Sequence, residues 1–170
     1  MNLKNFIRDI PNFPYEGILF RDITPILLNP AAFNEAVLQM NGLLGGLEYD
    51  LIAAPESRGF IVGIPLAQVV NKGFIPARKA GKLPYKTVAQ SYDLEYGSAT
   101  IEMHADAIKP GQRVVIADDL LATGGTCKAL CKLIEQQGGV VAGIVFFVEL
   151  NGLGGRDVLA GYDVWSLLKY

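Results

Sequence analysis

Along most of the chain, short, mainly apolar runs alternate with segments whose apolar residues have helical spacing. We expect strands at residues 49–54, 73–77, 114–117 and 140–148, and the run 114–117 shows no polar alternation at all. Such runs are typical of parallel strands that are buried on both faces. Three segments carry apolar residues every three or four positions: residues 30–44, 60–70 and 127–137. Because these segments are interleaved, the pattern predicts an α/β fold with a mostly parallel central sheet flanked by helices.

Other parts of the chain depart from this alternation. Residues 3–10 have the apolar spacing of a short amphipathic helix that Asn2 caps and Pro11 ends. From Pro11 to Pro30, four prolines and a glycine predict a well-packed irregular segment with few regular elements. We also expect a hairpin-like pair at 87–92 and 99–104, a loop at 149–155, a short helix at 156–159 and a final edge strand at 162–167.

Composition narrows the class of protein. With 170 residues, 51% of them hydrophobic and 19% charged, the chain fits one compact domain. No apolar run approaches the roughly 18 residues that cross a bilayer, and the first ten residues lack a signal-peptide core, so we expect a cytoplasmic protein without a membrane partner. A formal net charge of −2 gives no general attraction for nucleic acid, so any phosphate binding must be local.

Cysteine and histidine offer little for a metal or redox site. Cys127 and Cys131 lie one helical turn apart, where two small packing residues are a simpler interpretation than a metal-binding or redox pair. His104 is the single histidine, which excludes a histidine-rich metal site. Its expected place in a strand leaves it at most the role of a lone acid or base.

The richest chemistry follows the apolar run 114–117. Asp118 and Asp119 come directly after it, before a small, glycine-rich turn that opens the next helix. The turn consists of Ala122, Thr123, Gly124, Gly125 and Thr126. Its backbone N–H groups have no partner within the helix and can cradle a phosphate. The carboxylates would repel that phosphate, so we expect them to face hydroxyl groups or a hydrated cation of the same ligand; an acidic turn before an ordinary helix is the alternative.

Cations follow two other predicted strands. Arg58 lies in a polar turn after one of them and would point into the same crevice, unless it is a solvated surface charge. Arg78, Lys79 and Lys82 follow the next strand. Such clusters are usually solvated faces, but beside glycine and proline at a strand end this one also fits a mobile anion-binding loop.

The string Val-Val-Ile-Ala-Asp-Asp-Leu-Leu-Ala-Thr-Gly-Gly-Thr, residues 114–126, resembles the phosphoribosyl-pyrophosphate (PRPP) motif of type I phosphoribosyltransferases, in the form carried by adenine phosphoribosyltransferases. Further strings are similar to the same family: Phe-Pro-x-x-Gly-Ile-Leu-Phe-Arg-Asp-Ile-Thr-Pro from Phe13, Glu-Ser-Arg-Gly-Phe from Glu56, Arg-Lys-x-Gly-Lys-Leu-Pro from Arg78 and Ser-Tyr-Asp-Leu-Glu-Tyr-Gly from Ser91. ATPase and dinucleotide-binding interpretations lose support, because the chain has neither G-x-x-x-x-G-K-[ST] nor G-x-G-x-x-G.

The resemblance implies how PRPP would be bound. Residues 122–126 would hold its 5′-phosphate, and Asp118 and Asp119 would contact the 2′ and 3′ hydroxyls of the ribose. Four cations would bind the pyrophosphate, some of them across a dimer interface, and the first also takes part in catalysis: Arg58, Arg78, Lys79 and Lys82. Mg²⁺ is expected to arrive with PRPP and to have no direct protein ligand.

The base would be held by two other segments. The resemblance implies that Leu19 and Arg21 read the adenine edge through their backbones while the Phe20 ring stacks on it; a Phe20 that simply fills the core is the alternative. Leu150 would lie on the opposite side of the base, unless it only packs in the core.

The resemblance also divides the chain. It implies a hood at residues 1–33 for base recognition and a phosphoribosyltransferase core at 34–170, with a flexible loop at about 79–97. In that loop Glu95 is the proposed proton acceptor for the base nitrogen, and Tyr96 helps to close the site.

The implied reaction transfers the 5-phosphoribosyl group of PRPP to adenine, giving AMP and pyrophosphate in purine salvage, and the family forms homodimers. A transferase for another base, such as xanthine or hypoxanthine, is one alternative. A non-enzymatic PRPP sensor on the same fold is a second. Such a sensor could lack the catalytic loop and would usually carry a DNA-binding extension, whereas this chain has Glu95, Tyr96 and no basic N-terminal arm.

Overall fold

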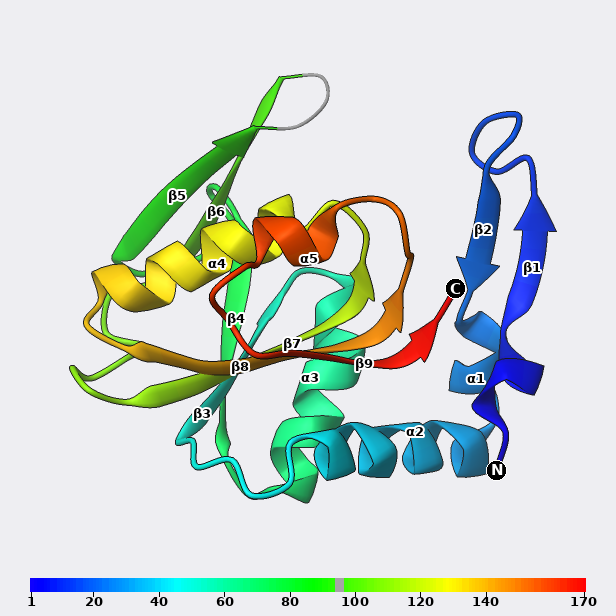
Figure 1. The fold of residues 1–170 in the computed structure, drawn as a ribbon. Helices are drawn as coiled ribbons and strands as arrows, with labels where there is room; N and C mark the ends of the chain where they lie inside the picture. The colour runs from blue at the N-terminus through cyan, green and yellow to red at the C-terminus, as the bar shows by residue number, and fades with distance from the viewer. Residues whose placement is uncertain (94–96) are drawn as a thin grey trace.

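A computed structural model gives the fold and describes residues 1–93 and 97–170 (Figure 1). Within them the main sheet consists of β3 (Leu51–Pro55), β4 (Gly73–Lys79), β5 (Thr87–Asp93), β6 (Ser98–His104), β7 (Arg113–Leu121), β8 (Val140–Glu149) and β9 (Val164–Lys169). The strand order is β5-β6-β4-β3-β7-β8-β9. The five strands from β4 to β9 in this order are parallel, and the β5–β6 hairpin joins β4 antiparallel. The predicted mostly parallel sheet is confirmed.

Helices cover both faces of this sheet. The helices α2 (Pro30–Leu43) and α3 (Arg58–Val69) lie on one face, and α4 (Gly125–Gln136) and the short α5 (Gly155–Val158) lie on the other (Figure 1). Along β7, Val115 and Ala117 belong to the apolar cluster under α2 and α3, whereas Val114 and Ile116 belong to the cluster under α4. Alternate side chains thus reach two separate cores, which explains why this run contains no polar residue.

The N-terminal segment forms a small unit at one end of the molecule. It contains η1 (Leu3–Phe6), β1 (Arg8–Pro11), β2 (Leu19–Asp22) and α1 (Thr24–Leu27), and β1 and β2 pair as a separate antiparallel sheet. The predicted cap is confirmed, since the Asn2 side chain accepts from the Lys4 N–H at 3.1 Å. The predicted helix over 3–10 is wrong beyond its first turn, and the irregular segment after Pro11 contains both β2 and α1. Pairing with β2, which local spacing does not reveal, makes residues 8–11 a strand.

Two strands extend beyond their predicted ends. β7 continues to Leu121, so Asp118 and Asp119 lie within the strand and not after it. β4 likewise includes Arg78 and Lys79. The predicted hairpin is confirmed by β5 and β6, and β5 lies within the segment 79–97 that the resemblance implies to be a loop.

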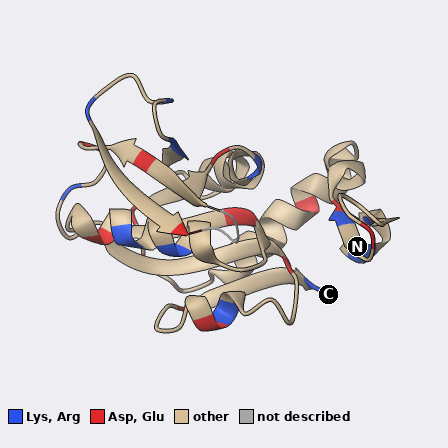
Figure 2. Ribbon diagram, turned by 90° about the horizontal axis from the view of Figure 1, so that it is seen from above, with Lys and Arg blue, Asp and Glu red and all other residues tan. Residues whose placement is uncertain are grey.

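Cys127 and Cys131 are free and buried in the core, as expected of packing residues. His104 ends β6, in the predicted hairpin. No helix within the described residues is long and apolar enough to span a membrane. Lysines and arginines are interspersed with aspartates and glutamates around the ribbon (Figure 2).

Candidate active site

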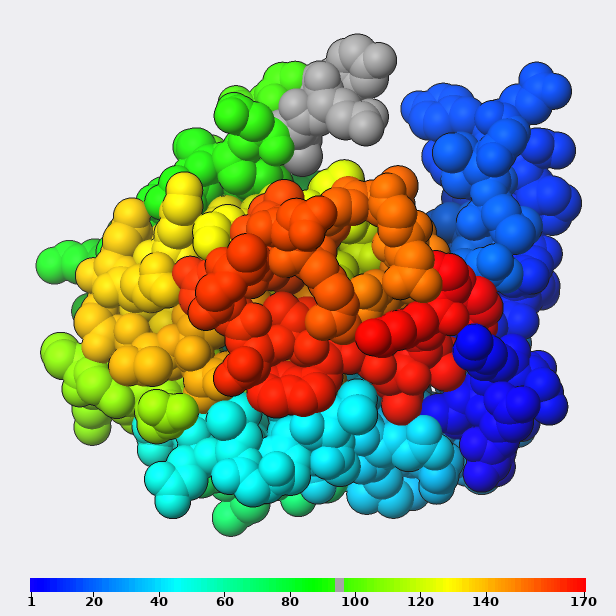
Figure 3. Space-filling view, in the orientation of Figure 1, coloured from blue at the N-terminus to red at the C-terminus, as the bar shows by residue number. Residues whose placement is uncertain are grey.

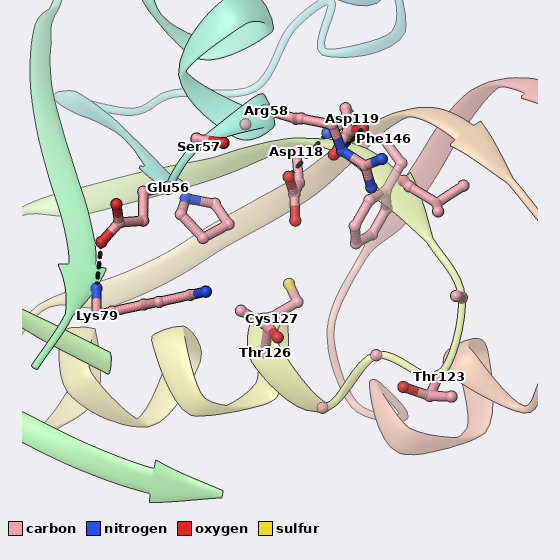
Figure 4. A pocket seen from close by; sticks show the side chains of 16 residues that line it. Glu56, Ser57, Arg58, Lys79, Asp118, Asp119, Thr123, Thr126, Cys127 and Phe146 are labelled. Carbon is pink, nitrogen blue, oxygen red and sulfur yellow. Dashed lines mark hydrogen bonds and ion pairs between the residues drawn. The ribbon is translucent and has the colours of Figure 1, made fainter. Parts of the chain in front are cut away.

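A polar cavity of about 400 Å³ lies at the carboxyl ends of β3, β4 and β7. Its charged and hydroxyl-bearing lining residues are Glu56, Ser57, Arg58, Lys79, Asp118, Asp119, Thr123 and Thr126 (Figure 4). The cavity exists because β7 extends beyond its neighbour β3. β3 pairs with β7 only as far as Ile116, whereas β7 pairs with β8 up to Leu121. Residues 118–121 therefore form a strand with one unpaired side, and the cavity lies there.

The predicted phosphate turn begins α4. Gly124 has φ +81°, in the left-handed region that favours glycine. A Cβ on Gly124 would lie 2.9 Å from the carbonyl oxygen of Gly155, and a Cβ on Gly155 would collide with the carbonyl oxygen of Ala122. Two backbone segments therefore meet directly, and all five residues of the turn, 122–126, line the cavity. The backbone is exposed there as phosphate binding requires.

The turn is also held from β5. The Thr126 hydroxyl donates a hydrogen bond to the Tyr92 hydroxyl at 3.1 Å. Tyr92 and Gly125 also line one small cleft beside α4. This contact places the strand that leads to residues 94–96 directly against the phosphate turn.

The two aspartates lie on the strand wall of the cavity. Asp118 accepts a hydrogen bond from the Asp119 N–H at 2.8 Å, and Asp119 forms an ion pair with Nε of Arg58 at 2.8 Å. Burial and the neighbouring Asp119 charge raise the pKa of Asp118 well above its usual value. Burial also raises the pKa of Asp119, which the Arg58 charge opposes. Two adjacent carboxyl groups of this kind can accept hydrogen bonds from a ligand at fixed positions. Because two neighbouring negative charges repel each other, the pair disfavours ionisation of both groups.

The four predicted cations occupy different places. Arg58 and Lys79 line the cavity, and Figure 4 shows the Lys79 side chain extending across it. Arg78 and Lys82 are not among its lining residues: the Arg78 guanidinium contacts a Glu56 oxygen at 3.3 Å and donates to the Lys82 carbonyl at 3.3 Å. Glu56 also accepts the Lys79 N–H at 2.6 Å. Burial would raise the pKa of Glu56, but the hydrogen bonds and charges of Lys79 and Arg78 lower it below its usual value.

A second, largely apolar cavity of about 500 Å³ lies between the hood and the core. All four residues predicted to bind the base line it: Leu19, Phe20, Arg21 and Leu150. The rings of Phe13 and Phe20 meet edge to face with centroids 5.2 Å apart, which fixes the Phe20 ring at the cavity wall.

The two cavities share a wall. Arg58, Asp119 and Leu120 line both of them. A molecule in the polar cavity and a planar molecule in the apolar cavity would therefore meet at this wall. The remaining predicted catalytic residues, Glu95 and Tyr96, lie outside the described residues.

Several contributors were not predicted from the sequence. Glu56 holds the backbone of Lys79, and Gly155 supports the phosphate turn. Glu149, at the end of β8, is only 4% exposed and accepts from Arg156 at 2.7 and 2.8 Å. These hydrogen bonds lower the pKa of Glu149 to about 2. The loop between Glu149 and Arg156 carries Leu150. The sequence does not reveal this ion pair, because an acid and an arginine seven positions apart form no recognisable local pattern.

Comparison with known proteins agrees with this geometry. The family model of the phosphoribosyl transferase domain matches residues 24–164. An adenine phosphoribosyltransferase of Lachnoclostridium phytofermentans is 58% identical over 168 residues, which cover 99% of this chain and 97% of the relative. One from Kosmotoga olearia is 55% identical over the full length of both proteins.

Solved structures give the same result. The crystal structure of adenine phosphoribosyltransferase from Thermoanaerobacter pseudethanolicus is similar with a TM-score of 0.96 and 53% identity, covering 99% of this chain and 98% of the other. The Saccharomyces cerevisiae enzyme has a TM-score of 0.89 and 39% identity, covering 96% and 95%. The chain therefore belongs to the phosphoribosyl transferase domain family, among the adenine phosphoribosyltransferases.

Proposed function

We propose that the chain transfers the 5-phosphoribosyl group of PRPP to adenine, giving AMP and pyrophosphate. One observation carries this proposal: a polar cavity with a glycine phosphate turn shares a wall with an apolar cavity. That arrangement suits a reaction that joins a sugar phosphate to a flat base. The Saccharomyces cerevisiae relative was crystallised with an imino-altritol bisphosphate and adenine, which supports the same division of ligands here.

The hood supplies a backbone edge for the base. The Ile18 carbonyl accepts from the Phe13 N–H at 3.2 Å, on the side of β2 that faces β1. Because backbone groups alternate along an antiparallel strand, those of Leu19 and Arg21 point to the free edge of β2. This edge offers a purine one N–H and one C=O from each residue, while the Phe20 ring stacks on the base and Leu150 closes the other side.

The phosphoribosyl group is bound by rigid backbone. Residues 122–126 donate N–H groups and threonine hydroxyls to the 5′-phosphate, and the macrodipole of α4 adds to that attraction. Asp118 and Asp119 accept hydrogen bonds from the ribose 2′ and 3′ hydroxyls. The anomeric carbon then lies toward the shared wall, where the base arrives, so the two reactants are held in line for displacement.

Cations stabilise the leaving group. Arg58 and Lys79 bind the pyrophosphate from the cavity wall, while Arg78 and Lys82 strengthen the positive potential behind Glu56. Positive charge develops on the ribose as the bond to pyrophosphate breaks, and the negative charge that leaves is neutralised by these side chains.

The carboxylates fit a Mg²⁺ ion that brings its own ligands. Glu56 is engaged by the Lys79 N–H and by Arg78, and Asp119 by Arg58. Mg²⁺ commonly keeps waters and substrate phosphates as ligands, so it can arrive with the pyrophosphate of PRPP. When bound, it would help to neutralise the negative charge of the departing pyrophosphate.

Glu95 accepts the proton that the base nitrogen loses, which makes that nitrogen a better nucleophile. Tyr96 and the rest of the segment 79–97 exclude water, which would otherwise hydrolyse PRPP. In this division of labour residues 1–33 are the base-binding hood and residues 34–170 the core, although the boundary between them falls inside α2.

We also propose that two copies pair. Ile64 and Val69 leave 42% and 44% of their surfaces exposed on α3, apolar surface that is suited to burial against a partner. Sedimentation equilibrium tests this proposal, and a monomer at micromolar concentration would contradict it.

The decisive experiment for the reaction is a side-by-side assay. The protein is mixed with PRPP, Mg²⁺ and adenine, hypoxanthine or xanthine, and nucleotide and pyrophosphate are measured. We expect AMP in preference to the other nucleotides. PRPP binding without turnover would indicate a sensor, and faster use of an oxopurine would indicate a different base specificity.

A further inference from the structure

We infer that Tyr170 is a positioning residue for the base. It ties the hood to the loop that carries Leu150, and so fixes the spacing of the two walls of the apolar cavity. This inference rests on the proposed function, because the apolar cavity is the one assigned to adenine.

On the hood side, the tie consists of the Tyr170 ring. The Arg21 guanidinium lies 4.2 Å from the ring centroid, and Lys4 Nζ lies 5.1 Å from it. Arg21 is held in place by an ion pair with Asp9, and its side chain is only 20% exposed. A cation over an aromatic ring is attracted more strongly where water is excluded. The ring therefore holds β2 through Arg21. It also contacts Lys4 of η1, whose Nζ donates in addition to the Lys169 carbonyl at 3.2 Å.

On the core side, the tie consists of the Tyr170 backbone. Its N–H donates to the Glu149 carbonyl at 3.0 Å, and its carbonyl accepts from the Asn151 N–H at 2.7 Å. These two bonds bracket Leu150. Glu149 is in turn fixed by the two hydrogen bonds from Arg156. A change of the Tyr170 side chain leaves these backbone bonds available, so it removes the link to the hood alone.

Both sides of the tie end at the apolar cavity. Arg21 and Leu150 line it from the hood and from the core. Figures 1 and 3 show the end of β9 lying against the hood. A two-stranded sheet such as β1–β2 is marginally stable by itself, so its position depends on such contacts. Without the ring, the two walls would change their spacing, while the backbone-built phosphate turn would not.

The test compares Tyr170→Leu with Tyr170→Phe. We expect Tyr170→Leu to raise the KM for adenine about tenfold, with kcat and the KM for PRPP within about twofold of wild type. Tyr170→Phe keeps the ring and restores most of the adenine affinity, since no hydrogen bond to the Tyr170 hydroxyl occurs in the described part of the chain. Tyr49→Leu is the matched control, because it removes a partly buried ring below Lys72, 6.0 Å away, that lines neither cavity.

Other results would overturn the inference. An unchanged adenine KM in Tyr170→Leu, or a Phe variant as impaired as the Leu variant, would exclude the ring as the tie. A similar rise in Tyr49→Leu would point to general destabilisation. Amide hydrogen exchange of residues 8–22 without substrates gives a measure that does not depend on activity, and it should be faster in Tyr170→Leu than in the wild type. If the wild-type protein made no AMP but this exchange were faster in the variant, the proposed function would be refuted and the structural tie would stand.

Discussion

The two cavities are built in opposite ways. The polar cavity lies at the ends of parallel strands, and its phosphate turn is a stretch of backbone supported by another stretch of backbone at Gly155. The apolar cavity lies between a separate two-stranded sheet and the core, and side chains hold its walls together. The phosphate site is therefore a property of the fold, whereas the base site depends on how the hood docks.

Loss of the proton acceptor should slow the reaction without weakening binding in either cavity. Glu95→Gln should lower kcat by about a thousandfold, because the base nitrogen loses its proton acceptor, while the KM values for adenine and PRPP change little. Steady-state kinetics for both substrates measures this. Glu48→Gln, on an exposed side chain, is the control. Wild-type turnover in the Glu95→Gln variant would remove Glu95 from the mechanism.

A single added methyl group in the phosphate turn should impair the use of PRPP in the polar cavity. Gly124→Ala adds a Cβ 2.9 Å from the Gly155 carbonyl oxygen at φ +81°, which displaces the turn and should lower kcat/KM for PRPP about a hundredfold. Gly111→Ala carries the same backbone strain, φ +85°, with nothing within 4 Å of the added Cβ, and serves as the control. Equal losses in both variants would mean that strain and not the close approach matters.

The loop that carries Leu150 should make the stability of the protein sensitive to acid. Glu149 has a pKa of about 2, below its usual 4.5, so its charge stabilises the fold fully above pH 4.5, and this contribution is lost as the pH falls toward 2. Glu149→Gln should lower the free energy of unfolding by about 2 to 3 kcal/mol at neutral pH and flatten the stability profile between these values. Urea denaturation at several pH values measures this, and a variant with the wild-type acid slope would contradict it.

The smallest effect should come from the base side. Phe20→Leu keeps an apolar wall but loses stacking, and should raise the KM for adenine about fivefold without changing that for PRPP. Phe74→Leu, from an edge-to-face pair with Phe60 at 5.7 Å outside both cavities, is the matched control. A KM for adenine that stays at the wild-type value would show that Phe20 only packs in the core.

The same contrast explains what the sequence revealed. The run Val114–Ala117 and the turn at residues 122–126 were recognisable, because burial on both faces and a glycine turn leave local patterns. The strand at Arg8–Pro11 was missed, since it exists through pairing with β2. That β7 continues through Asp118 is equally non-local, because β8 supplies the partner. The ties at Glu149 and Tyr170 join segments whose proximity only the folded chain creates.

The wall that Arg58, Asp119 and Leu120 give to both cavities has a consequence for ligand design. A single compound that links a flat heterocycle to an anionic tail would lose its rigid-body entropy once, instead of twice as two fragments do. The second group would bind at a high effective concentration, set by the length of the linker. The distance between the two bound groups therefore determines which linkers turn two weak fragments into one strong inhibitor.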